Sequence, residues 1–112
     1  MLAEALVRDL LAFRQERDWE QFHTPKNLAI AIAVEAGELL EQFQWTLDGD
    51  APSAPADRLA LRHELADVAI LLTYLAHDLG VDLDEAVRDK LRVNAERYPV
   101  AENRGRVKKH GR

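Results

Sequence analysis

Apolar side chains recur every three or four residues over four separate stretches of the chain, which is the spacing of one helix face. No stretch alternates apolar and polar residues with a period of two, so no β-strand is predicted. The sequence therefore predicts an all-α fold, a bundle of four helices. Gly80 is expected to end the third helix in the left-handed conformation. The predicted helices cover about residues 2–17, 25–47, 57–79 and 82–97.

The residues between these stretches carry the usual signals of helix ends. Thr24 stands before Pro25, which is a typical N-cap followed by a proline in the first turn, where its missing N–H costs nothing. Residues 48–56 are rich in Asp, Gly, Pro and Ser and predict a loop. Asp57 and Asp82 are predicted as the N-caps of the third and fourth helices.

Charge is unevenly distributed along the 112 residues. The net charge is −5, but residues 1–100 carry −9 and residues 101–112 carry +4. We expect one domain over residues 1–100, followed by a basic tail that is flexible, as most termini are. The acidic domain disfavours nucleic-acid binding, which needs a basic surface. The absence of cysteine excludes a disulfide scaffold and a thiol nucleophile.

The sequence predicts neither a signal peptide nor a membrane segment. Glu4, Arg8 and Asp9 interrupt the apolar pattern of the first helix, whereas a signal peptide has a continuous apolar centre. The longest apolar run, Val68–Ala76, is far too short to cross a bilayer. We therefore expect a cytoplasmic protein with no membrane partner.

Four carboxylates interrupt helices that are otherwise apolar. Glu35 and Glu38 lie within the second helix, and Glu64 and Asp67 lie within the third. Each pair has i, i+3 spacing, so its two side chains share one helix face. Burying a carboxylate is very unfavourable unless it is paired or binds a metal. The second helix offers these acids no cation, because Lys26 is the only basic residue between Arg17 and Arg58.

Two consecutive helices joined by a short loop pack antiparallel, which brings the two acid pairs opposite each other. Four converging carboxylates repel one another, and a divalent cation relieves this repulsion. Ligands that are all oxygen favour Mg²⁺, with Mn²⁺ as a possible substitute. The competing interpretation places these acids on solvated helix faces. A di-iron site is disfavoured, because the only Glu-x-x-His motif, Glu20 to His23, lies in a loop.

The acid motifs, in their order along the chain, resemble those of the all-α nucleoside triphosphate pyrophosphohydrolases, the MazG-like superfamily. Within that superfamily, the chain most resembles the dCTP pyrophosphatase branch. The resemblance covers about residues 10–99 and joins the acid motifs to a loop and to the fourth helix. The matching segments are residues 16–27, 34–45, 64–68 and 81–83, with Lys90, Asn94, Tyr98 and Pro99.

This resemblance implies Mg²⁺-dependent hydrolysis of a nucleoside triphosphate between its α and β phosphates. The expected products are the monophosphate and pyrophosphate, and the expected substrate is dCTP or a related pyrimidine deoxynucleotide. It also implies a homo-oligomer, either a dimer or a tetramer. The four acids match the metal ligands of the family. The residues that match its substrate contacts are Trp19, Glu20, Gln21, Phe22, His23, Trp45, Lys90, Asn94 and Tyr98.

Three positions differ from relatives in the superfamily. Val34 replaces a Glu that many members carry, although the dCTP branch also lacks that Glu. Leu10 and Leu71 replace a His and a Tyr that contact substrate in the animal dCTP enzymes. The resemblance therefore does not decide which base is preferred, whereas all four acids that match the metal ligands of the family are present.

Helical geometry places Asn27, Glu38 and Trp45 within about 20° of one line on the second helix, at about 100° per residue, and Asn27 is predicted as a further substrate contact. This arrangement suits a base stacked on Trp45 while its phosphates meet the metal, although spacing alone fits a core or interface Trp equally well. We predict Glu38 as the general base for water attack. The alternatives are a non-catalytic helical dimerisation module and a nucleotide-sensing module.

Overall fold

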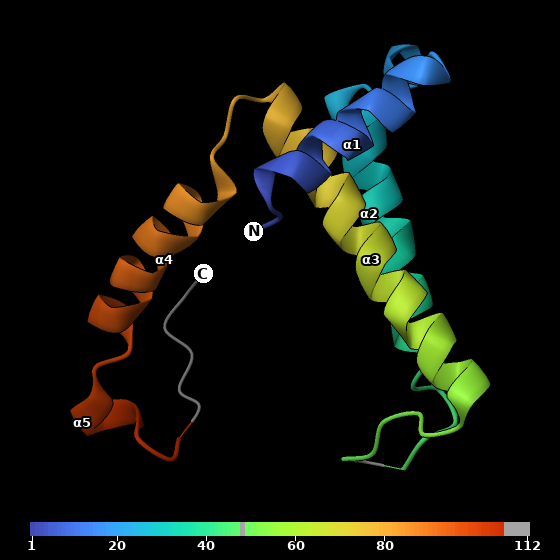
Figure 1. Ribbon diagram of the computed structural model, residues 1–112. Helices are drawn as coiled ribbons and strands as arrows, with labels where there is room; N and C mark the ends of the chain where they lie inside the picture. The colour runs from blue at the N-terminus through green and yellow to red at the C-terminus, as the bar shows by residue number, and fades with distance from the viewer. Residues whose placement is uncertain (48, 107–112) are drawn as a thin grey trace. The chain divides into compact units, whose positions relative to one another are not determined.

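Five α-helices and one short 3₁₀ helix account for most of the computed structural model, which describes residues 1–47 and 49–106 (Figure 1). In these ranges there is no β-strand, so the all-α prediction is confirmed. None of the described helices is both long enough and apolar enough to span a membrane. In chain order, the elements are α1 (Glu4–Glu16), η1 (Glu20–Phe22), α2 (Pro25–Glu41), α3 (Pro55–Asp78), α4 (Leu83–Arg97) and α5 (Val100–Asn103).

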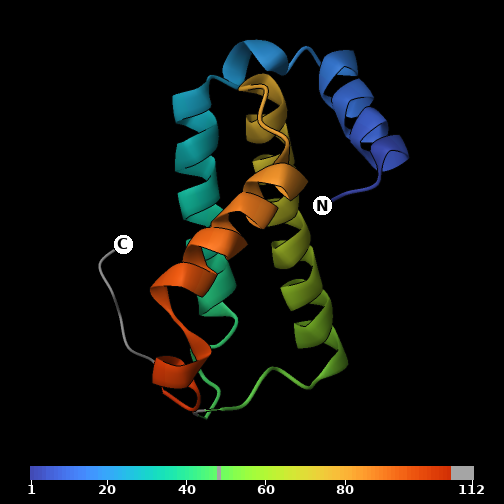
Figure 2. The same cartoon turned by 90° about the vertical axis from the view of Figure 1, so that its left-hand side faces the viewer.

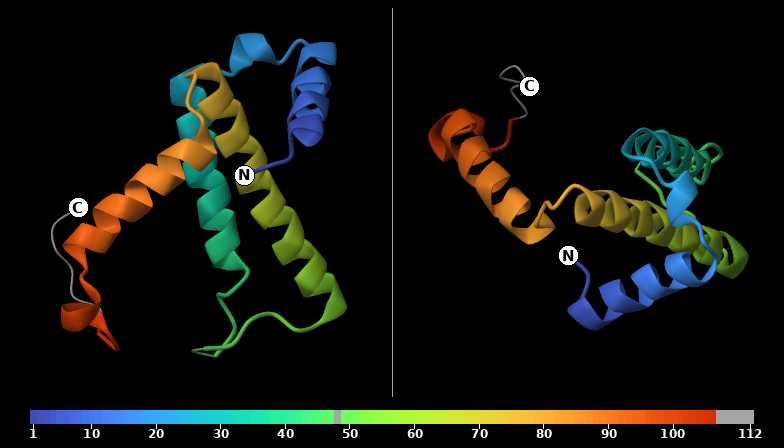
Figure 3. Two further views of the ribbon diagram at one scale, coloured as in Figure 1. Left: turned by 60° about the vertical axis from the view of Figure 1, so that its left-hand side comes forward. Right: turned by 90° about the horizontal axis from the view of Figure 1, so that it is seen from above.

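The chain forms two compact units, and Leu2–Gly80 makes up the larger one. In this unit α2 and α3 pack against each other over most of their length and run antiparallel (Figure 2), as the sequence predicts. Helix α1 packs on α3, so that α3 lies between α2 and α1 (Figure 3, right). Every acid of the two predicted pairs lies in this unit, on α2 or α3.

Several predicted helix ends are confirmed by their hydrogen bonds. Thr24 is the N-cap of α2, and its Oγ1 accepts a 3.1 Å hydrogen bond from the backbone N–H of Asn27. Gly80 follows α3 with a φ of +67°, the left-handed conformation that glycine adopts without strain. Asp82 is the N-cap of α4, and its Oδ1 accepts from the N–H of Glu85 at 3.1 Å.

Two predicted boundaries are wrong. The second helix ends at Glu41 rather than near Leu47, because the next N–H groups bond three residues back instead of four. Trp45 therefore lies in a turn and not on the helix. The third helix begins at Pro55 with Ala54 as its N-cap, because proline is well suited to the first helical position. Asp57 lies in the first turn, where its negative charge interacts favourably with the helix dipole.

The buried core of the larger unit is small. Leu28 of α2 and Leu61, Tyr74 and Ala76 of α3 are each less than a tenth exposed. Arg14 of α1 is the unexpected member of this buried set. Five other large apolar side chains are at least half exposed, so this core alone does not bury the apolar faces of the two helices: Ile30, Val34 and Leu40 of α2, and Leu59 and Leu65 of α3.

The smaller unit comprises Met1 and the chain from Val81 onward. Its α4 ends at Arg97, as predicted, and Tyr98 donates its backbone N–H to the carbonyl of Asn94 at 2.8 Å. The short helix α5 follows Pro99 and was not predicted. The expected flexible tail begins at residue 101, and its last part, residues 107–112, lies outside the described residues.

Candidate active site

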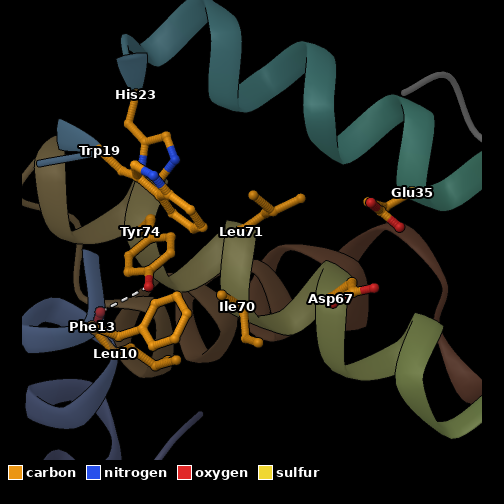
Figure 4. Close-up of a pocket in the computed structure, with 9 residues that line it drawn as sticks. All are labelled: Leu10, Phe13, Trp19, His23, Glu35, Asp67, Ile70, Leu71 and Tyr74. Atoms are coloured by element: carbon orange, nitrogen blue, oxygen red, sulfur yellow. Dashed lines mark hydrogen bonds between the residues drawn. The ribbon is translucent and has the colours of Figure 1, made fainter. Parts of the chain in front are cut away.

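Three carboxylates from α2 and α3 converge at one point of the helix pair. Glu35 of α2 and Glu64 and Asp67 of α3 each offer an oxygen, and these oxygens lie within 4.8 Å of one another. Glu35 and Asp67 face each other across the two helices in Figure 4. The i, i+3 spacing on α3 places Glu64 and Asp67 on the side that α2 covers. Oxygens this close can bind one divalent cation together.

The hydrogen bonding of this acid cluster is incomplete within residues 1–47 and 49–106. Oε2 of Glu35 and Oε2 of Glu64 are both buried, and neither has a hydrogen-bond partner there. A buried carboxylate oxygen without a donor is unfavourable. A hard cation such as Mg²⁺ takes oxygen ligands and supplies the missing positive charge. These residues therefore fit a divalent metal.

Glu38 adjoins the three acids from the next turn of α2. The Glu35 carboxyl lies close enough to share a hydrogen bond with Glu38, which raises the pKa of Glu38. The pKa of Glu35 is also raised, chiefly by a hydrogen bond with the Glu64 carboxyl and then by burial. Both shifts arise because these carboxyl groups resist ionising side by side. A bound cation reverses this effect.

A pocket of about 380 Å³ opens beside the acid cluster. Glu35 and Asp67 lie at one end of it, while Trp19, His23 and Tyr74 lie at the other (Figure 4). Side chains of α1, the loop around η1, α2 and α3 all contribute to it. The lining residues that the structure describes are Leu10, Phe13, Trp19, His23, Glu35, Asp67, Ile70, Leu71 and Tyr74.

Aromatic rings build the end of the pocket that lies away from the acids. Phe13 and Trp19 meet edge to face, with 5.6 Å between ring centroids. The rings of His23 and Tyr74 are tilted and lie 5.4 Å apart. Tyr74 donates its hydroxyl to the backbone carbonyl of Leu10 at 2.7 Å, the hydrogen bond drawn in Figure 4. This end offers flat apolar surfaces of the kind on which a nucleobase stacks.

His23 brings a polar atom to this aromatic surface. Burial lowers its pKa, and the nearby Arg14 guanidinium lowers it further, so the imidazole is neutral at pH 7. Its Nδ1 is buried and has no partner among the described residues. A neutral imidazole has one nitrogen that donates and one that accepts, so His23 can hydrogen-bond a ligand.

Other residues of the predicted substrate loop lie outside the pocket lining that the structure describes. Glu20, Gln21 and Phe22 are exposed on η1, and Gln21 donates to the backbone and carboxylate of Asp18. Asn27 donates its side-chain N–H to the carbonyl of Phe22 at 3.1 Å, which holds η1 against the start of α2. Their contact with substrate remains a prediction.

The remaining predicted contacts also stay predictions. Trp45 is 88% exposed in the turn after α2, so the single helix line through Asn27, Glu38 and Trp45 does not exist. Lys90 and Asn94 lie on α4 of the smaller unit, and Tyr98 is the C-cap of that helix.

The sequence prediction missed Tyr74 and two residues beside it, Arg14 and Asp78. A signal for two of them exists, because Tyr74 and Asp78 follow Asp67 by seven and eleven residues. At about 100° per residue, both fall within about 20° of Asp67 on the helix. Tyr74 thus lies on the same helix face as the candidate metal ligand Asp67, which made it a candidate for the pocket. Arg14 lies on another helix and has no such local signal.

Known proteins are similar to this chain in sequence and in fold. Residues 30–112 match the MazG-like family. The chain is 50% identical over 101 residues to dCTP pyrophosphatase 1 of Rattus norvegicus, covering 88% of this chain and 59% of that protein. It is 50% identical over 91 residues to dCTP pyrophosphatase 1 of Homo sapiens, covering 79% and 54%. The chain thus spans less than two thirds of the length of these relatives.

A solved structure resembles the fold. The crystal structure of a pyrophosphatase from Archaeoglobus fulgidus superposes with a TM-score of 0.74. Its sequence is 38% identical, and the match covers 86% of this chain and 91% of that one.

Proposed function

The chain belongs to the MazG-like family, and on this basis we propose that it hydrolyses a nucleoside triphosphate to the monophosphate and pyrophosphate. The proposed substrate is dCTP or a related pyrimidine deoxynucleotide. The names of the mammalian relatives and of the archaeal pyrophosphatase support this reaction class.

One observation carries the proposal: a single pocket joins the acid cluster to the aromatic end. Glu35 and Asp67 line one side of it, and Trp19, His23 and Tyr74 line the other. A nucleotide needs both surfaces, because its phosphates require a cation held by acids and its base requires a flat apolar wall. A helical dimerisation module needs neither of them.

We propose that Glu35, Glu38, Glu64 and Asp67 hold Mg²⁺, for which Mn²⁺ can substitute. When bound, Mg²⁺ neutralises triphosphate charge and lowers the pKa of a coordinated water. Glu38 is the proposed general base, because its carboxylate adjoins the acid cluster from the next turn of α2. His23 hydrogen-bonds the substrate, and the ring of Trp19 lines the aromatic end of the pocket.

We also propose a homo-oligomer. Ile30, Val34 and Leu40 of α2 are each at least half exposed within one chain. Apolar surface of this kind marks an interface between proteins. A second copy of the chain is the proposed partner, as the family resemblance implies. The cytoplasmic location stays a prediction from the sequence.

The test is an assay of the purified chain with a panel of eight common ribo- and deoxynucleoside triphosphates, in the presence of Mg²⁺ or of EDTA. We expect pyrophosphate and monophosphate in equal amounts, with dCTP hydrolysed fastest and no reaction in EDTA. Glu35→Gln should be inactive, whereas Glu41→Gln, an exposed acid at the end of α2, should retain activity.

The other outcomes of this assay are also decisive. Equal rates with all eight triphosphates would contradict the preference for pyrimidines, and would point to Leu10 and Leu71 as the cause, since both line the pocket. Tight binding without pyrophosphate release would favour a nucleotide sensor. Neither binding nor turnover would favour the dimerisation module.

A further inference from the structure

Arg14 of α1 is a charged residue in a buried position. Its exposed fraction is 4%, lower than that of most apolar side chains in the same unit. Its Nη1 and Nη2 donate to Oδ2 and Oδ1 of Asp78 on α3, both at 2.8 Å. This bidentate geometry is the strongest pairing available to an arginine. A buried charge persists only with such a partner, so the ion pair fixes α1 on α3.

The same guanidinium supports an aromatic ring of the pocket. The Cζ atom of Arg14 lies 4.6 Å from the ring centroid of Tyr74, in cation–π contact. Tyr74 contacts the His23 ring and donates its hydroxyl to the Leu10 carbonyl of α1. Its ring is therefore held by three groups. Arg14 and Asp78 are not among the lining residues described for the pocket, so they act on it through Tyr74 and His23.

We propose that Arg14 and Asp78 are positioning residues, whose ion pair holds the rings of Tyr74 and His23 at the aromatic end of the pocket and so sets its affinity for the nucleotide base. This inference rests on the proposed function. It assigns the ion pair no part in metal binding, because neither residue belongs to the acid cluster of Glu35, Glu64 and Asp67.

The charges around His23 give this inference a specific signature. The groups that act on its imidazole are Arg14 of α1, Asp78 of α3 and Glu20 of η1. Arg14 lowers the pKa of His23, whereas Asp78 and Glu20 raise it. Removing the charge of Arg14 should therefore raise the pKa of His23, and removing the charge of Asp78 should lower it. If the two substitutions only loosened α1, the pKa of His23 would shift in the same direction in both variants, toward the pKa of an exposed histidine.

The experiment compares Arg14→Met and Asp78→Asn with the wild-type chain at saturating Mg²⁺. We expect each variant to raise KM for dCTP about tenfold or more, while kcat changes by less than about threefold. Arg14→Lys keeps the charge but loses the bidentate fork, so it should restore part of the affinity. Arg8→Met is the matched control, because Arg8 lies on the same helix but is 67% exposed and pairs with Glu4 on its own helix.

Two further measurements separate the possible failures. Thermal stabilisation by Mg²⁺ should persist in both variants, and NMR titration of His23, assigned with a His23→Gln variant, should show the opposite pKa shifts. Should Arg14→Met not fold, Asp78→Asn and Arg14→Lys carry the same comparison. An unchanged KM in both folded variants, or His23 shifts in the same direction, would overturn the inference. An inactive wild-type chain would overturn the proposed function instead, and the titration of His23 would still decide the positioning role.

Discussion

Glu35 on α2 and Glu64 on α3 each bury a carboxylate oxygen that has no hydrogen-bond partner in the described part of the chain, and the two side chains belong to one cluster with Asp67. This juxtaposition raises the free energy of the folded chain without metal, because carboxylates that lie side by side repel each other. The fold thus accepts a local cost where a cation would be held.

A divalent cation should therefore stabilise the fold. At a free Mg²⁺ concentration about 100 times its dissociation constant, binding to the folded state alone adds about 2.7 kcal/mol. Glu35→Gln and Glu64→Gln should lose most of this gain, because each removes one ligand charge. Glu41→Gln should keep it. Differential scanning fluorimetry with and without Mg²⁺ measures the effect, and equal stabilisation of all four proteins would rule out the acid cluster as the site.

The stability of the metal-free chain should depend on pH in an unusual direction. The folded state raises the pKa of Glu35 and Glu38 above the ordinary value of 4.5, so just above that pH it holds protons that the unfolded chain has lost. His23, whose pKa is lowered, contributes in the opposite direction. The contribution of Glu35 and Glu38 to stability must fall as pH rises through this window. Saturating Mg²⁺ should remove the dependence, because the cation displaces these protons. Melting curves of metal-free His23→Gln, which lacks the opposing histidine, test this from pH 4.5 to pH 8, and a rise in its stability with pH would contradict it.

The acid cluster could be predicted from the sequence because its geometry is local. Glu35 and Glu38 share a face through helical spacing alone, as do Glu64 and Asp67, and α2 and α3 are consecutive helices that pack antiparallel. The fold class followed from the same periodicity. Neither prediction required knowledge of a distant contact.

The aromatic end could not be predicted in the same way. Arg14 and Asp78 lie 64 residues apart, and so do Leu10 and Tyr74, so their pairing depends on where α1 packs. Trp45 illustrates a different limit, because the end of α2 is decided by backbone hydrogen bonds three residues apart rather than by apolar spacing. Of the predicted substrate loop, Trp19 and His23 line the pocket.

The exposed apolar face of α2 should make the chain an oligomer. Val34 is 55% exposed in the middle of this helix, and in a monomer this exposed apolar surface does not contribute to the free energy of folding. We expect light scattering at micromolar concentration to give at least twice the 12.7 kDa mass of one chain. Val34→Lys should shift the mass toward one chain, whereas Gln15→Lys, an exposed change on α1, should not. A monomeric wild-type protein would refute the proposal.

Glu38 should be separable from the three acids that lie closest together. Glu35, Glu64 and Asp67 form the tight cluster, while Glu38 adjoins Glu35 and has a raised pKa. Glu38→Gln keeps the shape and hydrogen-bonding capacity of the side chain but cannot accept a proton as a base. We expect kcat for pyrophosphate release to fall by about 10²- to 10⁴-fold, while part of the stabilisation by Mg²⁺ remains.

The metal-free Glu38→Gln variant should be as stable as the wild type or slightly more stable, because one charge of the repelling group is gone. If Glu38 were merely a solvated helix residue, both activity and stability would be almost unchanged. Parallel measurement of pyrophosphate release and of melting temperature, each with and without Mg²⁺, decides between the two roles, and full activity in the variant would remove Glu38 from the catalytic mechanism.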